Sequence, residues 1–335
     1  MSASTASALH RLADSGAAPS CPPAPESIAD TGLTPEAITE LLLKTLYVQG
    51  ARSGQELVES LCLPFAIVDE LLLTLQHQRL IEVKRTAGAG RGGYIFDLTT
   101  AGSERAQEAM AAGQYVGPAP VPLAHYRTWI ERQSIRNVHV TRERLTAAFG
   151  DLVLDPAFVE SLGPAANSAK SLFIFGDPGN GKTVIAEVIA SLLGGWFYLP
   201  YAVDIGGQIM VVFDPVYHRP VAPEELGGAD EPQWLRDVPE HDRRFARVAR
   251  PVVMTGGELT LEQLDLQYDH DTKMYQAPFQ VKANGGVLIL DDFGRQRVPP
   301  RELLNRWILP LEKRMDFLTL HTGSKFPVPF ECLLI

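Results

Sequence analysis

The stretch that most constrains the fold is residues 171–193, "SLFIFGDPGNGKTVIAEVIASLL". Five mostly apolar residues lead into a glycine-rich octet, and a helix-like pattern follows. The octet, residues 176–183, satisfies G-x-x-x-x-G-K-[ST], the pattern of a phosphate-binding loop. Such a loop needs a buried strand before it and a helix after it. The sequence therefore predicts a phosphate-binding loop between a strand at 171–175 and a helix at 182–193.

Each residue type of the octet has a physical role in holding phosphate. The glycines leave room for backbone N–H groups to turn inward around phosphate oxygens. Lys182 would reach the β- and γ-phosphates, and the Thr183 hydroxyl would ligate Mg²⁺. The N-terminal end of the following helix adds partial positive charge. The expected nucleotide-binding residues are Gly176, Asp177, Pro178, Gly179, Asn180, Gly181, Lys182, Thr183 and Val184.

A second motif, "ANGGVLILDDFGRQ", lies about a hundred residues further along the chain. Residues 287–290 form an apolar run typical of a buried strand, which ends at Asp291 and Asp292. Asp291 is expected to hold Mg²⁺ together with Thr183, and Asp292 to orient the attacking water as a base. Together the two motifs predict binding of ATP and Mg²⁺, with Lys182 and Asp292 as the catalytic residues.

These motifs, followed by the helical pattern "PPRELLNRWILPLEKRM", resemble the AAA+ ATPases. The closest resemblance is to the branch that includes MoxR-like and sigma-54-activator ATPases, and it covers roughly residues 141–335. It implies an α/β fold, with a P-loop NTPase core of three α/β/α layers. It also implies ATP hydrolysis coupled to remodelling of a macromolecular partner, in a homo-oligomeric ring of six subunits with nucleotide between them.

Two features depart from the family's usual pattern at the site. Asp292 stands where the family usually has Glu, so its carboxylate is one methylene further from any attacking water. The segment "FPVPFECLLI" is similar to the strand that precedes the family's sensor-1 position, and the sequence stops at Ile335. The sensor-1 residue, the arginine finger and the helical lid would all lie beyond this point. We therefore expect a core truncated before sensor 1 and the lid.

The span from Lys182 to Asp291 is also longer than a compact core needs. We expect an insertion within about residues 202–283, containing a β-hairpin around Asp214-Pro215 and a polar, loop-like segment. Insertions of this kind often contact substrates in the AAA+ family. A surface loop without such a role is the alternative interpretation.

The N-terminal part of the chain has a different composition. Residues 1–33 are rich in Ala, Ser and Pro without a sustained apolar period, which predicts a disordered arm. Residues 34–115 show three helical patterns, two strand-like pieces around a glycine-rich tip, and a last helix. This layout resembles a winged-helix domain. A Pro-rich segment and a helix at 116–140 are expected to link it to the ATPase core.

A winged-helix-like domain raises the question of DNA binding. Residues 35–115 contain seven Lys and Arg against ten Asp and Glu, a net charge of −3. Phosphate contacts need a local positive excess, so this balance favours a protein partner over DNA. DNA binding would instead depend on Lys84, Arg85 or Arg91 in and around the predicted hairpin.

The remaining sequence features limit the alternatives. The three cysteines are far apart, which indicates reduced thiols rather than a disulfide framework. No signal peptide pattern and no run of 18 apolar residues is present, so we expect a cytoplasmic protein without membrane insertion. Two other functions stay open: a nucleotide-dependent adaptor that does not hydrolyse ATP, and an ATP-driven, DNA-binding regulator. A small-molecule kinase is less favoured, because two adjacent carboxylates suit water activation.

Overall fold

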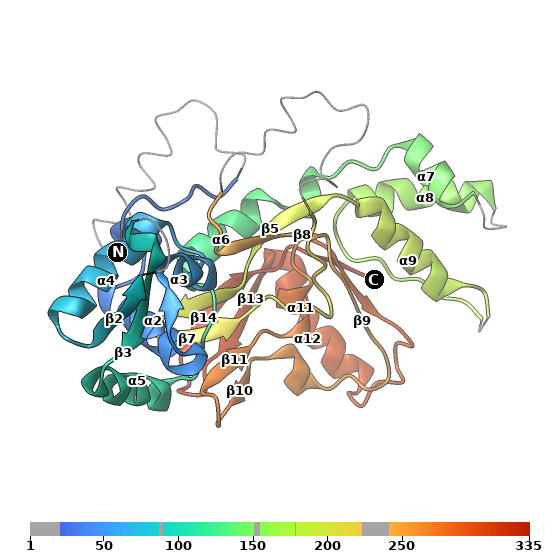
Figure 1. Ribbon diagram of the computed structural model, residues 1–335. Coiled ribbons are helices and arrows are strands. Elements are labelled where there is room, and N and C mark those ends of the chain that lie inside the picture. Colours follow the sequence, from blue (N-terminus) through green and yellow to red (C-terminus); the bar gives the residue numbers. More distant parts are fainter. Residues whose placement is uncertain (1–20, 87–89, 151–154, 178, 223–240) are drawn as a thin grey trace.

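The computed structural model describes residues 21–86, 90–150, 155–177, 179–222 and 241–335. Helices and several small sheets, both parallel and antiparallel, build a mixed α/β fold (Figure 1). Some predictions fall outside the described residues. They concern Pro178 of the phosphate-binding loop, residues 1–20 of the predicted arm and residues 223–240 of the predicted insertion.

The N-terminal unit contains the elements predicted for residues 34–115, in the predicted order. The Thr34 side chain caps its first helix by accepting a hydrogen bond from the Ala37 N–H, and Ser53 and Glu56 form a capping box. The sheet of this unit has the strand order β1-β3-β2. The elements are α2 (Pro35–Gln49), β1 (Arg52–Ser53), α3 (Gly54–Leu61), α4 (Phe65–His77), β2 (Ile81–Thr86), a 3₁₀ turn (Arg91–Gly93), β3 (Tyr94–Leu98) and α5 (Thr100–Ala112).

Residues 21–33 are ordered, so the predicted disordered arm is wrong for them. Thr31 and Leu33 are buried, and a 3₁₀ turn forms at Ala29–Thr31. The cause lies far away in sequence. The buried Arg244 guanidinium, ion-paired with Asp242, donates hydrogen bonds to the carbonyls of Thr31 at 2.9 Å and Pro120 at 3.3 Å. Arg244 thus anchors residues near Thr31, predicted as part of a disordered arm, and residues near Pro120, predicted as part of a linker.

The segment predicted as a linker also belongs to the folded body. β4 (Val121–Pro122) pairs with β6 in a five-stranded sheet, and α6 (Leu123–Arg132) follows it directly. Ala119 and Val121 are buried, because they pack with the cores on either side. The N-terminal unit therefore packs directly against this sheet and is not separated from it by an extended linker, as the left side of Figure 1 shows.

The five-stranded sheet has the order β10-β11-β7-β6-β4, and four of its strands come from the predicted insertion. Its β6–β7 hairpin turns at Gly206 and Gly207, so the prediction of a hairpin around Asp214-Pro215 is wrong. Both glycines have positive φ, which two-residue hairpin turns favour. Asp214 instead stabilises a turn with His218. The strands are β6 (Ala202–Ile205), β7 (Gln208–Val211), β10 (Gln267–Asp269) and β11 (Met274–Gln276).

A second sheet is fully parallel and has the order β15-β12-β9. Its strands are β9 (Val252–Thr255), β12 (Val287–Leu290) as predicted, and β15 (Leu333–Leu334). Gly286, directly before β12, lets the backbone pass close to Pro251, directly before β9. A Cβ at this position would lie 2.0 Å from the carbonyl oxygen of Pro251, so no larger residue fits without a backbone shift.

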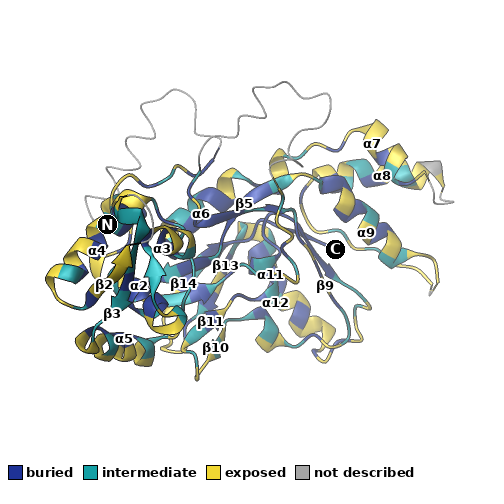
Figure 2. Ribbon diagram, in the orientation of Figure 1, coloured by how far each residue is buried: buried dark blue, intermediate teal, exposed yellow. Residues whose placement is uncertain are grey.

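Helices cover both faces of this parallel sheet. Val287 and Ile289 of β12 belong to a buried cluster with α7 (Arg142–Ala148), α8 (Pro156–Asn167) and α9 (Lys182–Leu193). The alternate residue Leu288 belongs to a cluster with Trp307 of α12 (Pro300–Lys313) and with residues next to α11 (Phe279–Lys282). This alternation follows from the two-residue period of a strand. The buried strands and the outward-facing exposed sides of the helices are visible in Figure 2.

Two antiparallel pairs complete the fold. The pairs are β5 (Trp196–Pro200) with β8 (Phe245–Ala249), and β13 (Met315–Thr319) with β14 (Lys325–Pro329); 3₁₀ turns form at Ile135–Asn137 and Leu261–Leu264. Within the described part of the chain, no helix combines the length and apolar character needed to cross a bilayer.

Candidate functional site

The segment before the glycine-rich loop differs from the prediction of a buried strand. Residues 171–175 run beside β15, where the Leu172 N–H donates to the Leu334 carbonyl at 2.8 Å, but they are not assigned as a strand. Phe173 is 66% exposed and Phe175 83% exposed. Among the described residues, this segment has a hydrogen-bonded neighbour, β15, on one side only. Few side chains therefore cover the two phenylalanine rings. Phe173 contacts Phe293 edge-on, with ring centroids 5.8 Å apart.

The loop leads into α9 at the predicted residue. Gly181 is the N-cap, with a positive φ of 69° that glycine accepts readily, and the helix begins at Lys182. The Lys182 ammonium donates to the carbonyls of Gly176 at 3.0 Å and Asp177 at 2.9 Å, so it lies over the mouth of the loop. Val184 is 42% exposed on the first turn of the helix. Gly179 and Asn180 are exposed in the turn of the loop.

Thr183 and Asp291 lie together, although 108 positions separate them in the sequence. The Thr183 hydroxyl donates to the Asp291 carboxylate at 2.9 Å. The other carboxylate oxygen accepts the backbone N–H of Asp292 at 2.9 Å, and the Asp291 N–H donates to the Thr255 carbonyl at 2.9 Å. The first turn of α9 and the end of β12 therefore meet at the carboxyl edge of the parallel sheet.

Asp292 occupies a tight turn beyond β12. Its φ is +52°, in the left-handed region that non-glycine residues seldom adopt. Its carboxylate lies 3.6 Å from the Arg295 guanidinium, and both side chains are more than half exposed. The Gln296 side chain fixes the turn by donating to the Asp291 carbonyl at 2.8 Å and accepting the Gly294 N–H at 2.7 Å. No motif in the sequence marked Arg295 or Gln296 as a residue of the site.

A third carboxylate lies at this edge of the sheet. β9 and β12 pair with Thr255 opposite Leu290, so both strands end side by side. Glu258 follows the end of β9, and its carboxylate accepts the Gly256 N–H at 2.9 Å and the Thr255 hydroxyl at 3.2 Å. The hydrogen bond from Gly256 is the main reason why the pKa of Glu258 lies below its ordinary value. The sequence feature that could have pointed to Glu258 is the apolar run "VVMT", which an acidic residue follows after two glycines. The second motif has the same kind of pattern, with "LIL" followed by "DD".

The oxygen atoms at this edge fit a magnesium ion. Mg²⁺ prefers oxygen ligands and is commonly held by one or two protein groups together with water and substrate phosphates. The Thr183 hydroxyl and the Asp291 carboxylate provide such a pair. Among the described residues, no group of three or more His, Cys, Asp or Glu side chains gathers as a metal site. The donor set therefore suits a substrate-associated Mg²⁺ better than a metal held by protein alone.

The basic residues around the N-terminal hairpin are paired with acidic residues. Lys84 forms an ion pair with Asp97 on the neighbouring strand. Arg91 donates to the Asp69 carboxylate of α4 at 2.6 Å. Both pairs reduce the positive charge that this face presents, because each cation lies against an anion of the same unit.

Comparisons with known proteins identify no family for this chain. No family model matches it, and no curated protein matches it. Among solved structures, it is similar to the structure of a mutant of Lactococcus lactis ZitR, with 21% sequence identity and a TM-score of 0.19. The matched region covers 31% of this chain and 66% of that one, so this chain spans slightly less than two thirds of that structure. At this TM-score, the similarity identifies neither a fold nor a function.

Proposed function

We propose that the chain is an AAA+ ATPase that binds Mg-ATP and couples its hydrolysis to remodelling of a macromolecular partner. The observation that carries this proposal is the meeting of Lys182, Thr183 and Asp291 at the carboxyl edge of a parallel sheet. Ligands of parallel α/β sheets bind beyond the carboxyl ends of the strands. The predicted phosphate-binding loop lies at this edge.

Lys182 and the loop would bind the phosphates of ATP. The Lys182 ammonium is held by two carbonyl oxygens, which are neutral acceptors that a phosphate can replace. The N-terminal end of α9 begins at this lysine and adds its partial positive charge. Gly176, Asp177, Gly179, Asn180 and Gly181 would supply backbone groups around the phosphates, with Pro178 and Val184 beside them.

Thr183 and Asp291 would hold Mg²⁺, which when bound neutralises charge on the phosphates. Asp291 is prepared for this role because the Asp292 N–H and the Thr183 hydroxyl fix its two oxygens. A further carboxylate at the same edge would orient the attacking water, the role that the sequence predicts for Asp292. A homo-oligomeric ring and a partner bound by the N-terminal unit belong to the same proposal.

The phosphate-binding role is tested by the affinity for ATP in the presence of Mg²⁺. Lys182→Ala removes a charged hydrogen bond worth about 1.5–3 kcal/mol, which corresponds to a loss of affinity of about 10- to 150-fold. Lys325→Ala is the matched control, because Lys325 is an exposed lysine on β14. Native-like affinity in Lys182→Ala would contradict the proposal.

A nucleotide-dependent adaptor without turnover is the second candidate function. The observation in its favour is the Arg295 guanidinium beside Asp292, because this ion pair competes with any interaction between Asp292 and a water molecule. Measurement of phosphate release at saturating Mg-ATP separates the two functions. Tight, Lys182-dependent binding without phosphate release would select the adaptor.

A protein partner is preferred to DNA for the N-terminal unit. The unit has a net negative charge, and Lys84 and Arg91 each lie against a carboxylate that offsets their positive charge. The test is binding of duplex DNA at low and high salt, in the native chain and in Lys84→Ala and Arg91→Ala variants. Salt-sensitive binding that these variants weaken would select the DNA-binding regulator instead.

A further inference from the structure

Glu258 is connected to the predicted magnesium ligands by a chain of hydrogen bonds. Thr183 donates to Asp291 at 2.9 Å, Asp291 donates through its N–H to the Thr255 carbonyl at 2.9 Å, and the Thr255 hydroxyl donates to Glu258 at 3.2 Å. Thr255 is buried, so this connection runs through the end of the sheet rather than across mobile surface groups. Glu258 therefore lies at the edge where the loop and Asp291 meet.

The turn that carries Glu258 packs against the turn that carries Asp292. A Cβ at Gly257 would lie 3.2 Å from the Arg295 carbonyl oxygen, so the two turns are close enough that only a small residue fits comfortably between them. No side chain from Gly256 or Gly257 intervenes. The turn that carries Glu258 and the turn that carries the second acidic residue of the "DD" motif are therefore neighbours at the end of the sheet.

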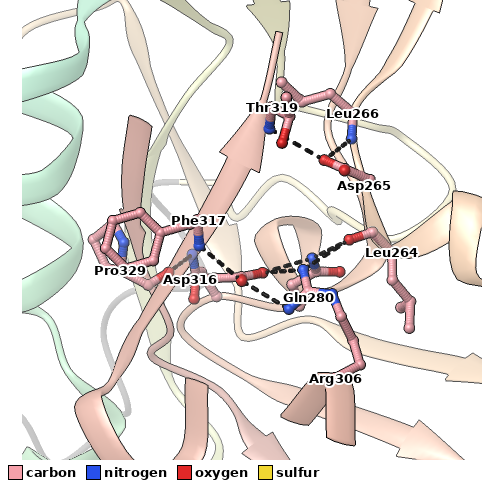
Figure 3. Close-up of polar contacts among 10 residues, drawn as sticks. Leu264, Asp265, Leu266, Gln280, Arg306, Asp316, Phe317, Thr319 and Pro329 are labelled. Atoms are coloured by element: carbon pink, nitrogen blue, oxygen red, sulfur yellow. Dashed lines mark hydrogen bonds and ion pairs between the residues drawn. The ribbon is translucent and has the colours of Figure 1, made fainter. Parts of the chain in front are cut away.

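The segment that begins with Glu258 is anchored at its other end. Leu259 and Leu264 are fully buried. The Leu264 carbonyl accepts hydrogen bonds from Gln280 at 2.8 Å and from Arg306 at 3.0 Å, as Figure 3 shows. Both donors also contact Asp316, so three elements hold the end of this segment. A carboxylate on a segment fixed at both ends can be held in a constant position.

Asp292 is less suited to contact water than Glu258. Asp292 has the shorter side chain, and its carboxylate lies against the Arg295 guanidinium. Glu258 has the additional methylene, and its partners are an N–H and a hydroxyl of its own turn. These partners orient the carboxylate without placing a cation on it.

We propose that Glu258 is the carboxylate that orients the attacking water, and that Asp292 is not. This inference rests on the proposed ATPase function. In the step, the water oxygen forms a bond to the γ-phosphorus, and the bond from that phosphorus to the oxygen bridging the β-phosphate breaks. ADP leaves with that oxygen, and the protons of the water pass to the released phosphate and to solvent. Glu258 accepts a hydrogen bond from the water and leaves the reaction unchanged.

The test compares Glu258→Gln with Asp292→Asn by single-turnover hydrolysis at saturating Mg-ATP, and measures ATP affinity for each. Glu258→Gln keeps an acceptor for Gly256 and Thr255 but loses the charge. We expect it to reduce turnover about 100-fold or more, within the range attributed to positioned acid–base groups, with ATP affinity within about threefold of native. Asp292→Asn is expected to lose less than about tenfold. Glu262→Gln, an exposed glutamate in the same segment, is the control.

Two outcomes would overturn the inference. They are turnover in Glu258→Gln within about threefold of native, and a loss in Asp292→Asn that exceeds the loss in Glu258→Gln. Failure of the ATPase proposal itself is recognised separately. In that case the native chain shows no Lys182-dependent binding of ATP, or it binds ATP without releasing phosphate, whatever residue 258 is.

Discussion

Removal of Arg306 tests whether the buried ion pair that joins α12 to β13 stabilises the fold. Its guanidinium donates to the two Asp316 oxygens at 2.8 and 2.6 Å (Figure 3). The same carboxylate accepts Gln280 at 2.9 Å and the Phe317 N–H at 2.8 Å. The side chain of Asp316 is 2% exposed and that of Arg306 is 23% exposed.

The expected magnitude follows from which charge is left without its partner. Leaving one member of a buried pair uncompensated costs about 3–5 kcal/mol in the free energy of unfolding. In Arg306→Ala, Asp316 keeps two of its four hydrogen bonds, so we expect a loss near the lower limit, about 3 kcal/mol. Asp316→Ala leaves an arginine that water can reach, so the expected loss is smaller, about 2 kcal/mol. The double variant should cost less than the sum of the single variants by about 1 kcal/mol or more.

Urea unfolding followed by far-ultraviolet circular dichroism measures these free energies. The control is Arg105→Ala, because Arg105 forms ion pairs with Glu40 and Glu108 on the surface and all three side chains are well exposed. Such surface pairs contribute about 0–1 kcal/mol. A loss below about 1 kcal/mol in Arg306→Ala, or strict additivity in the double variant, would refute this reasoning.

Three further changes have expected outcomes. Gly286→Ala should lower the free energy of unfolding by at least about 1–3 kcal/mol, because its Cβ would overlap the Pro251 carbonyl; native-like urea unfolding would contradict this. Burial lowers the pKa of His218 below its ordinary value near 6.5, so the unfolded chain gains a proton first as the pH falls. The free energy of unfolding should therefore decline from pH 7 to pH 5, and His218→Asn should reduce this pH dependence by up to about 1.4 kcal/mol per pH unit. If urea unfolding shows the same pH dependence in His218→Asn as in the native chain, the role of His218 is contradicted. Cys332 is fully buried and its pKa is raised by burial, so iodoacetamide at pH 8 should modify it only after denaturation, as peptide mass spectrometry would detect; rapid modification of the folded chain would count against this burial.

Local patterns predicted the elements whose boundaries depend on neighbouring residues. The helix at Lys182–Leu193 and the strand at Val287–Leu290 have the predicted bounds. Thr34 and Ser53, residue types that favour helix N-termini, cap their helices by side-chain hydrogen bonds. In each case, residues within four positions of one another decide the geometry, so a single sequence contains the necessary information.

Features that depend on distant residues could not be predicted in this way. The order of residues 21–33 depends on Arg244, more than 200 positions away, whose guanidinium binds the Thr31 carbonyl. The hairpin at Gly206–Gly207 competed with Asp214-Pro215, which is also a strong turn signal. Glu258 joins the candidate site only because β9 lies next to β12, and the order of strands in a sheet is not written in the local pattern of either strand.

The most direct test of the central claim is the dependence of ATP affinity on Mg²⁺. We expect the native chain to bind ATP more tightly with Mg²⁺ than with EDTA, because the ion would lie between the phosphates and the Thr183–Asp291 pair. Asp291→Asn should abolish this difference while retaining the affinity measured in EDTA. ATP affinity that is the same with and without Mg²⁺ in the native chain, or the same Mg²⁺ dependence in Asp291→Asn, would contradict the account.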